Sequence, residues 1–431
     1  MLKNIFKNII LIFLVFLIFF QIRILWFTIP EKSIEDKTKT IEYVEYLEPM
    51  CIIANFGENT HTKIYSTKDY LINYKKEINT ILNLEIKDLK PISIDEYLNL
   101  QNNRSIVIKY INSPFKGYID DGSKKISKEQ VREIYLSEEK CVIVLNAGIY
   151  EINLKANISQ NLTALEEKTY KSYKNFYELY GIKRNIYVPQ NNTLDVKDIF
   201  YSRGLNELTR TPRASLAKIY LNQDIDYIKE ITDITETTYV YEDKILKLAN
   251  NNMLIYKDTE ESINKVDDFK NSYTSALRFI SEKVGNINNI SLKKIEQRNS
   301  EYTFYFDRIE DALNVVMEDE NDKFYIAIKV AGDTIKNFRQ VYRIYGSDAA
   351  DNKISIEVLP IPSIIEKNLN LFDNKDTYEI LNQLKDIYYV YVDDLSNIDI
   401  YKTRLKIGVE IEYNNRRLIF LAEDGSFIME R

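Results

Sequence analysis

The sequence is poor in the residues that bend a chain, cross-link it or bind metal ions. Its 431 residues include 11 Gly, 8 Pro, 2 Cys and a single histidine, His61. Scarce Gly and Pro argue against a long flexible stalk or a disordered tail. One histidine excludes a His-based zinc site and leaves only His61 for a Ser-His-Asp or Cys-His arrangement. That histidine lies in the polar stretch "GENTHTK", which is typical of a surface loop.

Motifs for nucleotide and nucleic-acid binding are also missing. The chain contains no G-x-x-x-x-G-K and no G-x-G-x-x-G pattern, so no phosphate-binding loop is expected. The net charge is −7, and Lys and Arg are scattered along the sequence without a basic run. This distribution argues against a nucleic-acid partner. We therefore predict no catalytic residues, no cofactor and no metal, and a protein that is not an enzyme.

The two cysteines allow two interpretations. Cys51 and Cys141 each begin an apolar stretch, "CIIANF" and "CVIVLN", that is typical of a core strand. A disulfide between them would close a long loop and stabilise the fold by about 4 kcal/mol in the chain-entropy model. The alternative is that both are small apolar core residues. The sequence leaves the choice open.

What the chain does have is one long apolar run near its start. Residues 9–20 read "IILIFLVFLIFF", and an extension to Phe27 gives a helix about 28 Å long, close to the ~30 Å hydrocarbon core of a bilayer. Pro30 ends such a helix. We predict a single transmembrane helix. Its interfacial residues are Arg23, Trp26 and Phe27, because Arg can extend to the headgroups and aromatic rings favour this level.

A cleaved signal peptide and a buried core helix are the alternatives to an anchor. The segment after the run, "QIRILWFTIPEKS", has no small-residue cleavage site. Lys3 and Lys7 precede the run, which makes a core helix improbable. Charges flank the run on both sides, but a short N-terminal tail normally stays inside and large domains cross regardless of nearby charge. We predict a cell-membrane protein with a cytoplasmic N-terminus and an extracytoplasmic body.

The rest of the sequence predicts an α+β fold with antiparallel sheets. Helical spacing marks 66–82, 164–180 and 266–284, and strand-like runs include 104–111, 141–145, 149–154 and a meander at 237–258. A helix followed by strands occurs twice near the C-terminus, which suggests two related units. The predicted domains are an anchor (1–30), a first extracytoplasmic α/β domain (31–184), a central domain with a meander (185–260) and a C-terminal α+β domain (261–431, with units of about 261–360 and 361–431).

Several segments together carry a resemblance to a known family. These are "LWFTIP" (25–30) at the end of the apolar run, "ELTRTPRASLAKIY" (207–220), the meander "TTYVYEDKILKLANNNMLIYKD" (237–258) and "SALRFISEKVGN" (275–286). The chain resembles the YycH family, membrane-anchored regulators of the WalK (YycG) sensor histidine kinase. The resemblance implies a non-enzymatic regulator that works with a YycI-like partner and contacts the kinase through transmembrane and external segments. It also implies a YycI-like fold for the C-terminal units.

The hypothesis places kinase contact on one face of the apolar run. Leu14, Leu17, Ile18 and Gln21 share that face through their three- and four-residue spacing. Ordinary lipid contact is the alternative for the three apolar residues, and headgroup contact for Gln21. Two other functions stay open: an anchored module that binds a cell-wall polymer or peptide, and, less favoured, a membrane-tethered hydrolase. A wall-binding module would keep its function in residues 48–431 alone.

Overall fold

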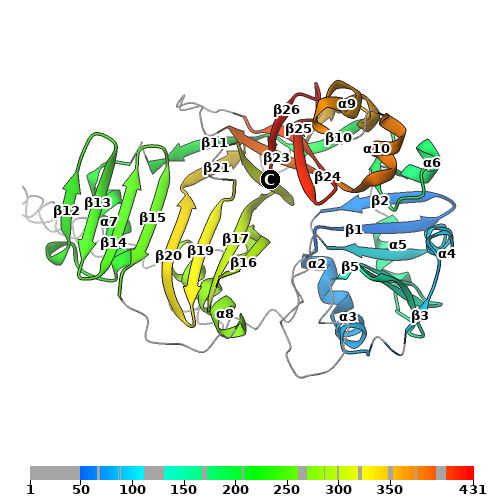
Figure 1. Cartoon of the computed structure of the whole chain (residues 1–431), viewed down its shortest axis with the longest axis horizontal. Helices are drawn as coiled ribbons and strands as arrows, with labels where there is room; N and C mark the ends of the chain where they lie inside the picture. The colour runs from blue at the N-terminus through cyan, green and yellow to red at the C-terminus, as the bar shows by residue number, and fades with distance from the viewer. Residues whose placement is uncertain are drawn as a thin grey trace, which may run out of the picture. The chain divides into compact units, whose positions relative to one another are not determined.

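The computed structural model describes residues 49–431, except 66–67, 86, 88, 111–130, 167–171, 206–207, 261–268, 286, 299, 319–322, 348–352, 374–375 and 395–403. Contacts divide the chain into Met1–Val44 and Glu45–Arg431, and every described residue belongs to the second unit. Figure 1 shows the chain with its helices and strands labelled.

The N-terminal half of the described chain forms a nine-stranded antiparallel sheet in the order β3-β7-β6-β5-β4-β1-β2-β8-β9. Its strands are β1 (Cys51–Gly57), β2 (Thr60–Ile64), β3 (Lys90–Pro91), β4 (Ser105–Lys109), β5 (Val131–Leu136), β6 (Cys141–Leu145), β7 (Gly148–Ile152), β8 (Tyr173–Asn175) and β9 (Tyr187–Pro189). The central strands are apolar on both faces because each face has its own core. The strands predicted at 104–111, 141–145 and 149–154 are confirmed as β4, β6 and β7.

Short helices accompany this sheet: α2 (Lys68–Leu71), η2 (Ile72–Tyr74), α3 (Lys75–Leu82), α4 (Ile94–Leu100), α5 (Ser159–Glu166) and α6 (Phe176–Tyr180). The helix predicted at 66–82 is broadly confirmed, since α2, η2 and α3 follow one another there. The single helix predicted at 164–180 is wrong, because β8 lies between α5 and α6. Gly181 does end α6, in the left-handed conformation at φ 70°.

The two cysteines are free and buried. Cys51 lies in one core of the nine-stranded sheet and Cys141 in the core on its other face. Their strands, β1 and β6, are separated by β4 and β5, which places them roughly 14 Å apart at the usual strand spacing. A disulfide needs Cα atoms within about 7 Å. The structure therefore confirms the alternative that both cysteines are small apolar core residues.

The C-terminal half contributes a second, 13-stranded sheet in the order β12-β13-β14-β15-β20-β19-β17-β18-β23-β24-β25-β26, with β16 paired to β17. Its strands are β12 (Lys229–Thr232), β13 (Glu236–Tyr241), β14 (Lys244–Ala249), β15 (Met253–Asp258), β16 (Ile290–Arg298), β17 (Glu301–Glu310), β18 (Leu313–Glu318), β19 (Ile326–Ala331), β20 (Thr334–Val341), β23 (Leu384–Asp394), β24 (Lys406–Tyr413), β25 (Arg416–Leu421) and β26 (Phe427–Glu430).

This sheet is built from one pattern used three times, a helix followed by an antiparallel meander (Figure 1). Helix α7 (Arg210–Leu221) precedes β12–β15, α8 (Phe269–Lys283) precedes β16, β17, β19 and β20, and α10 (Thr377–Gln383) precedes β23–β26. Strand β18 leaves the second unit and pairs in parallel with β23 of the third. The sequence revealed only the second and third units. It predicted the meander of the first unit correctly but not its helix α7.

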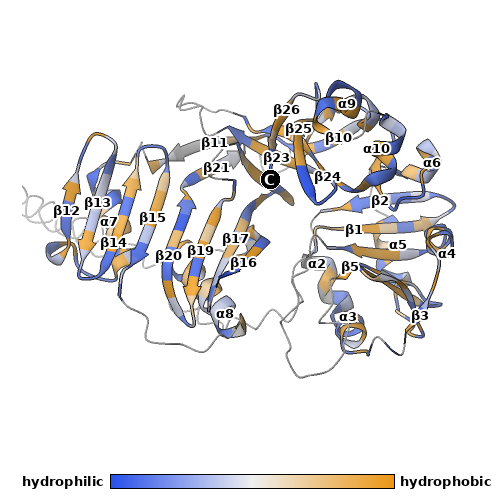
Figure 2. Cartoon of the chain, viewed as in Figure 1, coloured by the Kyte–Doolittle hydropathy of each residue, from blue (hydrophilic) through white to orange (hydrophobic). Residues whose placement is uncertain are grey.

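Helices α7 and α8 cover one face of the first two meanders. Tyr220 of α7 and Phe279 of α8 pack against Tyr256 of β15 and Phe338 of β20. Strands β13, β14 and β15 largely alternate buried and part-exposed residues. Figure 2 shows hydrophobic and hydrophilic residues along the same strands. Helix α8 confirms the helix predicted at 266–284, and Gly285 follows it at φ 108°.

Two pairs of strands and four short helical elements complete the described structure. The pairs are β10 (Thr193–Lys197) with β22 (Lys353–Glu357) and β11 (Ile199–Gly204) with β21 (Arg343–Ser347). The remaining elements are η6 (Ile225–Tyr227), η7 (Ile287–Asn289), α9 (Ile361–Lys367) and η8 (Leu369–Leu371). The strand pairs join 193–204 to 343–357, so segments far apart in the chain are held together.

The predicted fold class is wrong. The described residues are mostly β-sheet rather than α+β, because stretches such as 164–180 that have helical spacing contain strand instead. Within the described ranges, no helix has both the length and the apolar character needed to cross a bilayer. The segment predicted to be a transmembrane helix, residues 9–27, lies outside the described residues.

Candidate functional site

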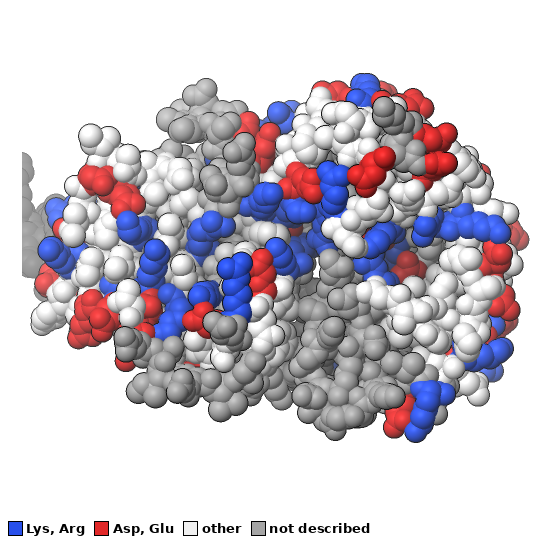
Figure 3. Space-filling view, viewed as in Figure 1, with Lys and Arg blue, Asp and Glu red and all other residues white. Residues whose placement is uncertain are grey.

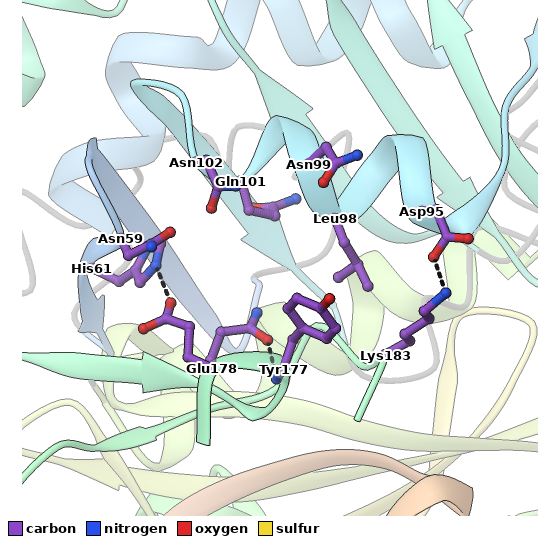
Figure 4. Close-up of a pocket in the computed structure, with 11 residues that line it drawn as sticks. Asn59, His61, Asp95, Leu98, Asn99, Gln101, Asn102, Tyr177, Glu178 and Lys183 are labelled. Atoms are coloured by element: carbon purple, nitrogen blue, oxygen red, sulfur yellow. Dashed lines mark hydrogen bonds and ion pairs between the residues drawn. The ribbon is translucent and has the colours of Figure 1, made fainter. Parts of the chain in front are cut away.

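A polar pocket of about 410 Å³ opens beside the edge of the nine-stranded sheet (Figure 4). Helix α4 forms one wall and the segment around α6 forms the other. Its lining residues are Asn59, His61, Asp95, Leu98, Asn99, Gln101, Asn102, Asn175, Tyr177, Glu178 and Lys183. Side-chain amides dominate this lining, and amides both donate and accept hydrogen bonds. The pocket is therefore suited to a polar ligand with several hydrogen-bonding groups, such as a sugar or a peptide group.

His61 lies at the base of this pocket and is 2% exposed. Its Nδ1 is 2.8 Å from Asn55 Oδ1, and its Nε2 is 2.9 Å from Glu178 Oε1. The Asn55 amide donates onward to Gln101 Oε1 at 2.9 Å and to Ser105 Oγ at 2.8 Å. The surface loop predicted for His61 is thus wrong. Glu58 and Asn59, both at positive φ, form a turn instead. Strand β2, which contains His61, begins directly after this turn.

The electrostatics of His61 are set by opposing effects. Burial lowers the pKa of His61 below its usual 6.5, and the Glu178 carboxylate acts against that shift. Lys174 neutralises part of the Glu178 charge through an ion pair of 2.9 Å. Both ring nitrogens face oxygen atoms, which is the environment of a doubly protonated ring. Because burial prevails, we expect a neutral ring at pH 7 that gains a proton only in acid.

Helix α4 is capped at its N-terminus and is linked to the opposite wall of the pocket through its first turn. Ser93 Oγ accepts from the Glu96 backbone N–H, and Glu96 accepts from the Ser93 N–H, which makes a capping box. Asp95 pairs with Lys183 at 2.7 Å across the mouth of the pocket, where both side chains are exposed. Such an exposed pair contributes little stability. The Asp95–Lys183 pair does, however, place one negative and one positive side chain at the pocket entrance.

A buried ion cluster lies behind α4, and we refer to Lys109, Glu133 and Asp386 as the ionic junction. Lys109 Nζ, in β4, is 2.5 Å from Asp386 Oδ2 in β23 and 3.5 Å from Glu133 Oε1 in β5. It also donates to the Asn185 carbonyl at 2.5 Å. Burial opposes the Lys109 charge, but Asp386 and Glu133 prevail and raise its pKa. Lys109 and Lys63 likewise overcome burial and lower the pKa of Asp386.

Lys63 reinforces the contact between the nine-stranded sheet and β23. Its ammonium donates to the Ile387 carbonyl at 2.8 Å and lies 4.9 Å from the ring centre of Tyr388. Burial lowers the pKa of Lys63. Nearby, Arg132 of β5 pairs with Glu412 of β24 at 3.2 Å. The nine-stranded sheet and the third helix-meander unit are thus joined by buried charge as well as by apolar packing.

The pocket and the ionic junction share a wall. Tyr97, on the inner side of α4, donates to Glu133 Oε2 at 2.6 Å, and Asn185 donates to the same oxygen at 2.6 Å. Residues of the same helix, including Leu98 and Asn99, line the pocket. A shift of α4 on ligand binding would therefore displace Tyr97 from Glu133. The contacts Tyr97–Glu133, Glu133–Lys109 and Lys109–Asp386 thus connect the pocket wall to β23.

The residues predicted from the sequence as functional all fall elsewhere. They lie outside the described residues: Leu14, Leu17, Ile18, Gln21, Arg23, Trp26 and Phe27. Sequence reasoning missed the pocket because its residues come from four separate segments of the chain. One signal was present, the turn residues "GEN" directly after the apolar stretch "CIIANF", which favour a hairpin and place His61 in its second strand. Among the described residues, no group of three His, Cys, Asp or Glu could hold a metal ion.

Comparisons with known proteins give little guidance. No protein-family model matches the chain, and no curated protein matches it. Among solved structures, it is similar to the C-terminal domain of YpeB from Bacillus megaterium, with 11% identity and a TM-score of 0.29. That match covers 52% of this chain and 97% of the YpeB domain. A likeness this weak carries no argument about function, and the comparisons support no assignment to the YycH family.

Proposed function

We propose that this protein is a non-enzymatic regulator of a two-component sensor histidine kinase, acting at the outer face of the cell membrane. The partners in this proposal are a WalK-like kinase and a YycI-like protein. The sequence supports the location through its apolar run at 9–20 and supports the partner class through the resemblance described above.

The observation that carries the proposal is the continuity between the pocket and the ionic junction. A regulator needs a site whose occupancy biases a second surface, and it can do so only through different affinities in two states. Here Tyr97 links the pocket helix to Glu133, and Lys109 links Glu133 to Asp386 in β23. In the proposed mechanism, ligand binding between α4 and α6 changes this chain of contacts and alters the surface that the third helix-meander unit presents to its partner.

The test is association with the kinase in native membranes. We would exchange Leu14, Leu17, Ile18 and Gln21 with residues on the other side of the apolar run, which keeps the overall hydrophobicity. We expect the scrambled chain to lose crosslinking to the kinase and to alter signalling. A matched control exchanges the same number of residues away from this face. Unchanged crosslinking and signalling in the scrambled chain would defeat the proposed contact.

A second variant separates the membrane contact from the relay. Tyr97→Phe removes the hydroxyl that donates to Glu133 and leaves the ring in its packing position. We expect this variant to reach the membrane and crosslink to the kinase while the kinase output changes. Tyr227→Phe, at an exposed side chain that does not line the pocket, is the control. Equal kinase output in Tyr97→Phe and the unchanged chain would contradict the relay.

A further inference from the structure

The first two helix-meander units leave one sheet face without a cover of described elements. The strands run β12-β13-β14-β15-β20-β19-β17-β16, and helices α7 and α8 pack on the opposite face. Residues of this open face are part-exposed or exposed, whereas many of their neighbours along the central strands are buried on the side of the helices. Figure 3 shows Lys and Arg side chains gathered over this side of the sheet.

The strand register arranges the open face into two rows that run across the strands. The first row is Ile231, Thr238, Lys247, Ile255, Arg339, Ala327, Tyr305 and Lys294. The second row is Lys229, Val240, Ile245, Lys257, Asn337, Lys329, Thr303 and Glu296. We name the six cations of these rows the basic face: Lys229, Lys247, Lys257, Lys294, Lys329 and Arg339. The sequence shows no basic run because each comes from a different strand.

The spacing of these cations follows from sheet geometry. Neighbouring strands lie about 4.8 Å apart, so Lys247 and Arg339, two strands apart, are separated by about 10 Å. Lys257 and Lys329 in the second row are also two strands apart, and Arg339 and Lys294 are three strands apart, about 14 Å. The rows themselves are about 7 Å apart, two residues along a strand. The result is a repeating array of positive charge.

Carboxylates on this face reduce the charge without cancelling it. Glu236 pairs with Lys247 at 2.6 Å, Glu296 with Lys294 at 2.7 Å, and Glu301 with Lys329 at 2.5 Å. Among the described residues of the two rows and their ion-pair partners, cations outnumber carboxylates. This excess contrasts with the net charge of −7 for the whole chain. The two rows therefore carry an excess of positive charge although the chain as a whole is acidic.

A hollow of about 410 Å³ lies in the basic face. Lys294, Lys329 and Arg339 line it together with Lys323, whose ammonium donates to the Glu430 carbonyl at 2.8 Å. Hydroxyl and amide groups stand between these cations, from Thr303, Tyr305 and Asn337. Cations with interspersed donors suit a ligand that carries both repeated negative charge and hydroxyl or ester oxygens.

We propose that the basic face binds a linear polyol-phosphate polymer, such as poly(glycerol phosphate), laid across the strands. Single-stranded DNA has a similar charged backbone, but its bases bind best by stacking on aromatic rings, and the two rows contain one aromatic side chain, Tyr305. Five of the six cations are Lys, which acts as a compact point charge on single phosphate oxygens. The hydroxyl and ester oxygens of such a polymer can also bond to Thr303, Tyr305 and Asn337 between the cations, whereas the side chains of an acidic polypeptide offer only carboxylates there. A sheet of eight strands twists by roughly 20° or more per strand, so a planar bilayer cannot meet both ends of the rows, but a flexible chain can follow them. This inference does not depend on the proposed kinase contact.

The test measures binding of the full chain, in detergent, to a synthetic poly(glycerol phosphate). We expect binding that weakens by on the order of 50-fold between 50 and 200 mM salt, if about four phosphates are neutralised. The variant Lys247→Gln, Lys257→Gln, Lys329→Gln and Arg339→Gln together should weaken binding by more than about tenfold. The matched control replaces four exposed lysines elsewhere, Lys75, Lys76, Lys90 and Lys385, with Gln and should bind as the unchanged chain does.

Comparison ligands decide the class of partner. Poly-glutamate, vesicles rich in anionic lipid and single-stranded DNA are each measured at the same salt concentration, and we expect all three to bind more weakly than poly(glycerol phosphate). Equal loss in the basic-face and control variants would show that net charge alone drives binding and would overturn the proposal. Tighter binding of any comparison ligand, or no binding of the polymer, would also overturn it. Thermal unfolding of both variants checks that they are folded.

Discussion

The nine-stranded sheet and the open face of the second sheet differ in where their charged side chains lie: the first has a buried ion cluster, and the second has exposed cations. At the ionic junction, Lys109 and Asp386 are both nearly inaccessible and pair with one another across two parts of the fold. On the basic face, Lys294 and Lys329 keep about half of their side-chain surface in solvent even though each has a carboxylate partner. Buried pairs fix the geometry of the fold, because either charge alone is costly, whereas exposed ones remain available to a ligand.

Breaking the ionic junction should have the largest effect on stability. Asp386→Ala removes the carboxylate 2.5 Å from Lys109 and leaves a buried ammonium with only partial compensation. We expect the free energy of unfolding to fall by about 3–5 kcal/mol, measured by urea unfolding. The triple variant Lys109→Met, Glu133→Gln, Asp386→Leu removes all three charges of the junction and should recover most of that loss. If Asp386→Ala cost less than 1 kcal/mol, the junction would not fix β23.

His61 is a buried titratable group, and its burial should make the stability of the protein depend on pH. Its folded-state pKa lies below the 6.5 of an unfolded histidine, so the unfolded chain binds more protons in the window just below pH 6.5. Titration of His61 therefore leaves the free energy of unfolding unchanged above pH 6.5. Below pH 6.5 it lowers that free energy as the pH falls, by at most about 1.4 kcal/mol per pH unit.

The chain has a single histidine, so one substitution isolates this effect. His61→Gln should flatten the stability curve between pH 6.5 and the onset of carboxylate titration near pH 5. Urea unfolding at several pH values provides the measurement. A slope that persists unchanged in His61→Gln would mean that other groups produce it.

Loss of the α4 cap should cost less. Ser93→Ala removes the oxygen that accepts from the Glu96 N–H, and we expect a loss of about 1 kcal/mol in thermal or urea unfolding. The control is Ser215→Ala, an exposed serine within α7, which should change stability by less than about 0.5 kcal/mol. Equal effects at the two positions would argue against the cap as the device that fixes α4.

The smallest change is expected on the basic face. Lys247→Gln breaks the part-exposed ion pair with Glu236 and should change the free energy of unfolding by less than about 0.5 kcal/mol. The same substitution should nevertheless weaken polymer binding, which titration would detect. A large loss of stability here would show that the cations of this face serve the fold rather than a ligand.

Local periodicity predicted much of the secondary structure. The helix at 266–284, the meander at 237–258 and strands such as 141–145 follow from spacing and turn residues within one segment. The interval 164–180 was misjudged because Tyr173 and Phe176 have helical spacing although Tyr173 lies in β8. Spacing alone does not distinguish a helix from a strand followed by a short helix.

The candidate site could not be predicted from the sequence because it depends on pairings between distant segments. His61 and Glu178 are 117 residues apart, and Lys63 and Ile387 are 324 residues apart. The two rows of the basic face likewise depend on the register of eight strands. In the sequence these cations are scattered, and only the pairing of the strands brings them onto one face.

The most direct test of the proposed function is kinase activity in reconstituted membranes. The sensor kinase is incorporated into proteoliposomes with and without the full chain, and its autophosphorylation rate is measured. We expect the full chain to change that rate and the chain with Tyr97→Phe to change it to a different extent. An autophosphorylation rate that is the same with and without the full chain would contradict the account.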